Sequence, residues 1–128
     1  MRRLIVEPEA EGHHLVLYTR LILKEATNRG WEVTILTTES ARRHPAFAVL
    51  AGDQDRVLET ILIPDLVAAE SMGSFALLAA QLRIWKALAR ACSTDPGFAE
   101  FDMIYCINLD YFEKALSLRG SPFGARPF

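Results

Sequence analysis

The stretch from Arg2 to Thr38, RRLIVEPEAEGHHLVLYTRLILKEATNRGWEVTILTT, holds the pattern that decides the fold. It begins with a short apolar run that ends at Glu7-Pro8, which predicts a buried strand followed by a stop. A nearly continuous run of β-favouring residues over 31–37 predicts a second strand, covered on both faces. A helical pattern over 14–28 lies between the two runs. Strand, helix and strand in so short a stretch indicate a right-handed βαβ unit.

The helix expected over 14–28 has one apolar face, and a glycine follows its last residues. Arg29-Gly30 supplies the residue type that most often ends a helix. Leu17 and Leu21 widen the face, as expected for a helix packed on a sheet. The residues that define the face recur at spacings of three, four and four: Leu15, Tyr18, Ile22 and Ala26.

The alternation of helix and strand continues along the rest of the chain. A weaker helical segment over 40–51 is interrupted at His44-Pro45, and strands are expected over 57–63 and 102–107. A long helix is expected over 66–92, and a short one runs from Asp110 to about Leu118. The apolar face predicted for the long helix consists of Phe75, Leu78, Leu82, Trp85, Ala89 and Cys92.

This alternation predicts an α/β protein with a Rossmann-like parallel sheet and helices on both faces. The length of 128 residues fits a single domain over 1–128. A proline-rich loop over 121–128 follows the last helix, where a doubly wound sheet would normally continue with a strand. We therefore expect the domain to be incomplete, truncated before its last strands.

Composition excludes several classes of function. The 14 basic and 16 acidic residues give a net charge of −2, which argues against general nucleic-acid binding. The arginine pairs Arg2-Arg3 and Arg42-Arg43 are interpreted as solvated surface. The two cysteines are not at metal-ligand spacing, so we expect reduced thiols and a cytoplasmic protein. Polar residues interrupt the apolar region 66–82, so no transmembrane segment is expected, and peripheral membrane contact stays open.

The loop after the first strand is the first candidate site, because ligands of open parallel sheets bind beyond the carboxyl ends of the strands. Gly12 lets the backbone approach a ligand, and His13 and His14 can exchange protons near neutral pH. The same residues could equally form a turn and a solvated helix start. A single glycine is not the G-x-G-x-x-G dinucleotide motif, and no P-loop ending is present. No metal site and no cofactor are expected.

Several segments together resemble the opening of family 4 type GT-B glycosyltransferases. They are Glu11-Gly12-His13-His14-Leu15, with Tyr18 after it, then Arg29-Gly30-Trp31-Glu32-Val33-Thr34-Ile35-Leu36-Thr37, and Phe101-Asp102-Met103-Ile104-Tyr105. The similar segments are strongest over 11–38 and 101–124.

The resemblance implies the amino-terminal, acceptor-side domain of an enzyme that moves a sugar from a nucleotide-sugar donor to an acceptor. By position, it implies that Gly12, His13 and His14 face a cleft, and that Asn108 and Asp110 lie on the same rim. The donor-binding domain and its paired glutamates are missing from this sequence, so we expect this chain alone to be inactive.

Two alternatives compete with this interpretation. The chain could be a stand-alone α/β binding or regulatory domain without chemistry of its own, or a nucleotide-binding enzyme of another Rossmann type. Asp110 also has a structural interpretation, since Asp110 and Glu113 have the spacing of a capping box at a helix start.

Overall fold

A four-stranded, all-parallel sheet forms the centre of the molecule, in the order β3-β2-β1-β4. The computed structural model describes residues 1–8, 14–52, 59–65 and 73–128. The strands are β1 (Arg2–Val6), β2 (Glu32–Thr38), β3 (Glu59–Ile63) and β4 (Met103–Cys106). The α-helices are α1 (Arg20–Asn28), α2 (Glu39–Arg43), α3 (Pro45–Gly52), α4 (Ser74–Thr94) and α5 (Glu113–Arg119). Shorter helical turns are η1 (His14–Thr19), η2 (Pro96–Glu100) and η3 (Leu109–Tyr111).

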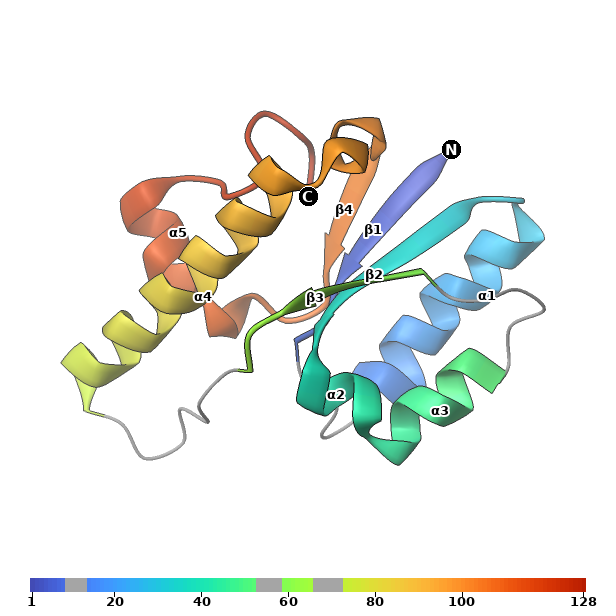
Figure 1. The fold of residues 1–128 in the computed structure, drawn as a ribbon, viewed down its shortest axis with the longest axis horizontal. Helices are drawn as coiled ribbons and strands as arrows, with labels where there is room; N and C mark the ends of the chain where they lie inside the picture. Colours follow the sequence, from blue (N-terminus) through green and yellow to red (C-terminus); the bar gives the residue numbers. More distant parts are fainter. Residues whose placement is uncertain (9–13, 53–58, 66–72) are drawn as a thin grey trace.

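Helices cover both faces of the sheet, as the sequence predicts (Figure 1). Successive strand residues point to opposite faces, so each strand contributes to two cores. Ile5 and Ile35 pack against α1, α2 and α3, with Leu23 among the buried residues of that cluster. Leu4 and Leu36, from the neighbouring positions, pack with α4 and its Leu88 on the other face. The near-continuous apolar strands thus reflect burial on both sides.

The βαβ unit that the sequence predicts is present as β1, α1 and β2, and a glycine follows each of the helices α1 and α5. Gly30 and Gly120 have φ of +66° and +76°, in the left-handed region that side chains rarely adopt. They terminate α1 and α5 after the predicted Arg-Gly pairs. The break at His44-Pro45 also occurs, between α2 and α3. Residues 121–128, all of which the structure describes, contain no strand.

The first helix differs from its prediction in the face that it buries. Its opening turn, η1, is π-helical, and α1 follows directly. A π turn holds more residues than an α turn, so a face extrapolated at 3.6 residues per turn slips around the axis. Thr19, Leu23 and Ala26 are buried, whereas Tyr18 and Leu21 are 50% and 59% exposed. Of the predicted face, Ala26 is buried and Ile22 is half-buried; the side chain of Leu15 lies outside the described part.

The long helix begins later than expected and buries a face offset from the predicted one. α4 starts at Ser74, and residues 66–72 of the expected helix lie outside the described part. Its buried residues are Ala80, Gln81, Ile84 and Leu88. The predicted face flanks this stripe, and its first member, Phe75, is 91% exposed. The helical period was therefore right, and the phase was set by the sheet.

The arginine pair at the start of the chain is a structural element rather than solvated surface. Arg2 pairs with Glu100, and lies 3.6 Å from Glu32 and 3.7 Å from Glu59, so it joins three neighbouring segments at the amino edge of the sheet. Arg3 is 7% exposed and its guanidinium lies 4.5 Å from the ring centre of Trp31. The interpretation of this pair as solvated was wrong.

Candidate functional site

The carboxyl ends of β1 and β4 form the point where the strand order reverses. β2 and β3 follow β1 on one side, and β4 lies on the other side of β1. Val6 is in register with Cys106, and the N–H of Ile107 donates to the carbonyl of Val6 at 3.4 Å. The segments that follow the two strands therefore leave the sheet side by side. Open parallel sheets bind their ligands at such a position.

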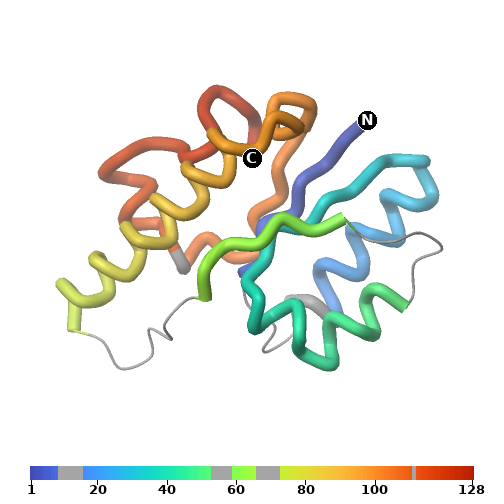
Figure 2. The backbone as a smooth tube through the Cα atoms, in the orientation of Figure 1, coloured from blue at the N-terminus to red at the C-terminus, as the bar shows by residue number. Residues whose placement is uncertain are grey.

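The glycine-histidine loop leaves β1 at this point. Gly12 and His13 lie outside the described residues. The backbone of His14 begins η1, and its side chain is not among those described. The described flanks of the loop, Pro8 and His14, belong to the carboxyl edge of β1 and to the start of the first helix. Figure 2 shows the two described elements that flank the loop, β1 in dark blue and the first helix in lighter blue.

Asn108 and Asp110 form the rim that follows β4. Oδ1 of Asn108 accepts a 3.0 Å hydrogen bond from the N–H of Asp110, which closes a local turn and starts η3. The side chain of Asp110 is exposed. The capping-box interpretation of Asp110 and Glu113 is wrong, because α5 begins at Glu113 with Phe112 in the cap position. Asn108 is the residue that caps, which leaves the Asp110 carboxylate at the surface.

Gln81 holds this rim in place from the opposite helix. It is 2% exposed, and its Nε2 donates to the carbonyl of Asp110 at 2.7 Å. Its Oε1 accepts from the N–H of Lys114 at 2.8 Å. Both ends of one buried amide are thus satisfied, one by η3 and the other by the first turn of α5. Sequence reasoning missed Gln81; a glutamine at the centre of an apolar helical face was the available signal.

Thr38 ties the end of β2 to the start of the glycine-histidine loop. Its hydroxyl donates to the carbonyl of Pro8 at 2.9 Å, and its oxygen accepts from the N–H of Ala41 at 3.2 Å as the cap of α2. The threonine is 1% exposed. It therefore fixes the chain at the residue where the loop leaves the sheet, and the sequence marks it only as the last residue of the second strand.

Asp65 makes the corresponding link at the end of β3. Its Oδ1 accepts a 2.9 Å hydrogen bond from the N–H of Ser40. That backbone hydrogen bond, assisted by the Ser40 hydroxyl, lowers the pKa of Asp65 below its ordinary value of 3.8, and the charge of Arg43 acts in the same direction. The ends of β1, β2 and β3 are thereby joined through Pro8, Thr38, Ser40 and Asp65.

Glu7 is a further candidate that the sequence prediction did not single out. Its side chain is fully buried at the end of β1, and its N–H donates to the carbonyl of Leu36 at 2.9 Å. A buried carboxyl group at the ligand-binding edge of a sheet is costly unless it is paired or neutral, and such groups cluster at functional sites. The signal was present, since Glu7 directly follows the apolar residues Leu4, Ile5 and Val6.

Within the described residues, no group of three or more His, Cys, Asp or Glu could hold a metal ion. Among the same residues, no helix is both long and apolar enough to cross a membrane. The side chains described at this edge of the sheet present carboxylate, amide and hydroxyl groups.

Comparison with known proteins does not assign the chain to a family: no family model matches it, and a search of curated proteins finds no match.

Proposed function

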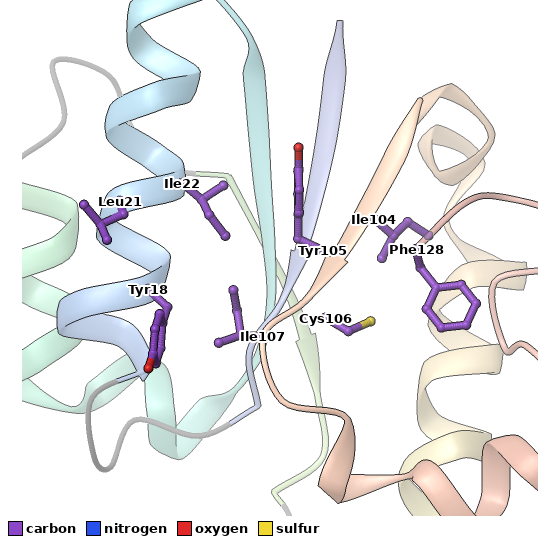
Figure 3. A pocket seen from close by; sticks show the side chains of 8 residues that line it. All are labelled: Tyr18, Leu21, Ile22, Ile104, Tyr105, Cys106, Ile107 and Phe128. Carbon is purple, nitrogen blue, oxygen red and sulfur yellow. The ribbon is translucent and has the colours of Figure 1, made fainter.

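We propose that this chain is the amino-terminal, acceptor-side part of a glycosyltransferase that moves a sugar from a nucleotide-sugar donor to an acceptor. The proposal is supported above all by the strand order, which brings the carboxyl ends of β1 and β4 side by side at the switch point. Described residues of the two segments that resemble GT-B enzymes, 11–38 and 101–124, line one hollow beside β4, with Tyr18 and Ile22 from the first segment and Ile107 from the second (Figure 3).

In this proposal the edge provides one wall of a cleft, and it binds the acceptor. Asn108 and Asp110 would contact acceptor hydroxyl groups from the β4 side, and Gly12 with His13 and His14 would line the β1 side. The buried carboxyl group of Glu7 would lie at the base of that loop. A second domain would supply the donor site, and without it this chain transfers no sugar.

The first experiment is an amide NMR titration of the ¹⁵N-labelled chain with a panel of sugars and sugar phosphates, and separately with NAD⁺. We expect a saturable response to carbohydrate at the amides of Asn108 and Asp110. Asp110→Asn should weaken that response because the exposed carboxylate makes the contact, whereas Glu100→Gln, at the opposite edge of the sheet, should not. Saturable binding of NAD⁺ without a carbohydrate response would contradict the proposal.

The second experiment assays the natural gene product for sugar transfer from UDP- and GDP-sugars. We expect nucleotide release that depends on an added acceptor, with an effect of Asp110→Asn mainly on the KM for the acceptor. If the chain is instead a stand-alone binding or regulatory domain, we expect no nucleotide release. It should then bind a ligand of another class in a saturable way.

A further inference from the structure

The helix α4 carries positive charge that no acidic residue of the helix offsets. Its 21 residues include three of the 14 basic residues of the chain and none of the 16 acidic ones, so the helix carries +3 in a chain of net charge −2. In α2, by contrast, Arg43 pairs with Glu39 four residues away. Within the described parts of the chain, no carboxylate pairs with Arg83, Lys86 or Arg90. The three charges therefore face solvent without a counter-charge beside them.

An exposed aromatic side chain lies on the same stripe of α4 as these charges. The stripe consists of Phe75, Ala79, Arg83, Lys86 and Arg90, at spacings of four, four, three and four, which place side chains on one side of a helix. All five residues are exposed, and Phe75 is 91% exposed. Figure 1 shows the beginning of α4 at the outer margin of the molecule. The stripe is thus a straight surface about 22 Å long, aromatic at its first end and cationic along the rest.

The surface of an anionic lipid bilayer matches this stripe in charge and in shape. Lipid phosphates attract Lys and Arg near the membrane, and an aromatic side chain is stabilised at the boundary between headgroups and acyl chains. The rest of the chain holds all the acidic residues, so a negatively charged surface favours approach by α4 over approach by other parts of the molecule. A nucleic-acid duplex offers phosphates on a curved surface and no apolar layer that Phe75 could enter. The bilayer is therefore the partner that uses both features of the stripe.

We propose that α4 docks this protein on anionic lipid membranes, with the stripe from Phe75 to Arg90 as the contact surface. The helix lies along the membrane, because its cations are distributed over its length. Phe75 enters the boundary between headgroups and acyl chains, and the three basic side chains contact lipid phosphates. This inference stands on the charge and exposure of α4 and is independent of glycosyl transfer.

The test measures cosedimentation of the purified chain with two kinds of vesicle, phosphatidylcholine alone and phosphatidylcholine mixed with phosphatidylglycerol. We expect binding to the anionic vesicles only. Raising the salt concentration from about 0.1 M to about 1 M should release the chain, because the Debye length falls from about 10 Å to about 3 Å. The combined variant Arg83→Gln, Lys86→Gln and Arg90→Gln should bind the anionic vesicles at least about tenfold more weakly than the parent chain.

Matched controls separate contact through α4 from a general effect of charge or apolar surface. The combined variant Lys24→Gln, Arg42→Gln and Arg43→Gln removes the same charge from exposed positions of α1 and α2, so it should change the affinity by less than about twofold. Phe75→Ala should weaken binding at least about threefold. Val49→Ala, at a 54% exposed position of α3, should leave binding unchanged.

Several outcomes would overturn the proposal. They are a lack of binding to anionic vesicles, equal binding to vesicles without anionic lipid, and equal loss of affinity in the α4 variant and its charge-matched control. A nucleic-acid duplex that competes with the vesicles and binds the same stripe more tightly would also overturn it, because the stripe would then serve a different partner.

Discussion

Gln81 and Asp110 are 29 positions apart in the sequence, yet Nε2 of Gln81 donates a 2.7 Å hydrogen bond to the carbonyl of Asp110. The other end of the same amide accepts from the N–H of Lys114, so one side chain of α4 links η3 to the first turn of α5. The candidate rim is thus positioned by a residue outside it. Its conformation depends on the packing of α4 as much as on its own turn.

Replacing Gln81 by methionine should destabilise the protein and loosen the rim. Methionine keeps the length of the side chain but makes neither hydrogen bond, which should cost about 1–2 kcal/mol of the free energy of unfolding. Urea denaturation measures the loss, and the amide shifts of Asp110 and Lys114 report the rim. Lys86→Met, at an exposed position of the same helix, should change stability by less than about 0.5 kcal/mol. Equal effects of the two variants would show that the amide bonds have no role.

Thr38→Val should weaken the link between the end of β2 and the start of the glycine-histidine loop. The substitution preserves the branched shape and removes the hydroxyl that caps α2 and donates a hydrogen bond to Pro8. We expect the free energy of unfolding to fall by about 1–2 kcal/mol. Hydrogen exchange at the amide of Ala41 should become faster. Thr38→Ser retains the hydroxyl and serves as the control, so similar exchange rates in the two variants would contradict the assignment.

The link made by Asp65 should be lost in acid. A carboxyl group whose pKa is lowered in the folded state stabilises the fold above its unfolded pKa, and this contribution disappears as the pH falls through the folded value. Because the pKa of Asp65 lies below 3.8, the loss should occur below about pH 4. Urea midpoints between pH 5 and pH 3 should fall less steeply in Asp65→Asn than in the parent chain. If the urea midpoints of the two proteins fell in parallel with pH, the stabilising role of the hydrogen bond between Asp65 and Ser40 would be refuted.

The two thiols should react slowly in the folded state. Burial raises the pKa of Cys92 and of Cys106 from 9.0 to about 12, which lowers the thiolate population at pH 8 on the order of a thousandfold. Alkylation by iodoacetamide, followed by mass spectrometry, should therefore be slow in buffer and fast in concentrated urea. Stabilisation by the neutral thiols should persist below about pH 9 and be lost as the pH rises toward 12. Rapid labelling of the native protein at pH 8 would contradict the raised pKa of the two thiols.

Much of the fold could be predicted from local patterns. The apolar run that ends at Val6 and the β-favouring run over 31–37 coincide, to within one residue at each end of the second run, with the parallel strands β1 and β2, because a strand covered on both faces is rich in such residues. The glycines after Arg29 and Arg119 end their helices, because φ there is positive. Both are properties of a few neighbouring residues, so they appear in the sequence directly.

The phase of the helices and the frame of the candidate site were decided by tertiary structure. A π turn at the start of the first helix rotates its apolar face, and the sheet selects which stripe of α4 is buried. The residues that hold the candidate edge, Gln81 and Thr38, act across long separations in sequence, where periodicity carries no information. The sequence by itself determined the order and type of the strands and helices. Only packing decided which side chains face the core, because burial depends on contacts between segments that lie far apart in the sequence.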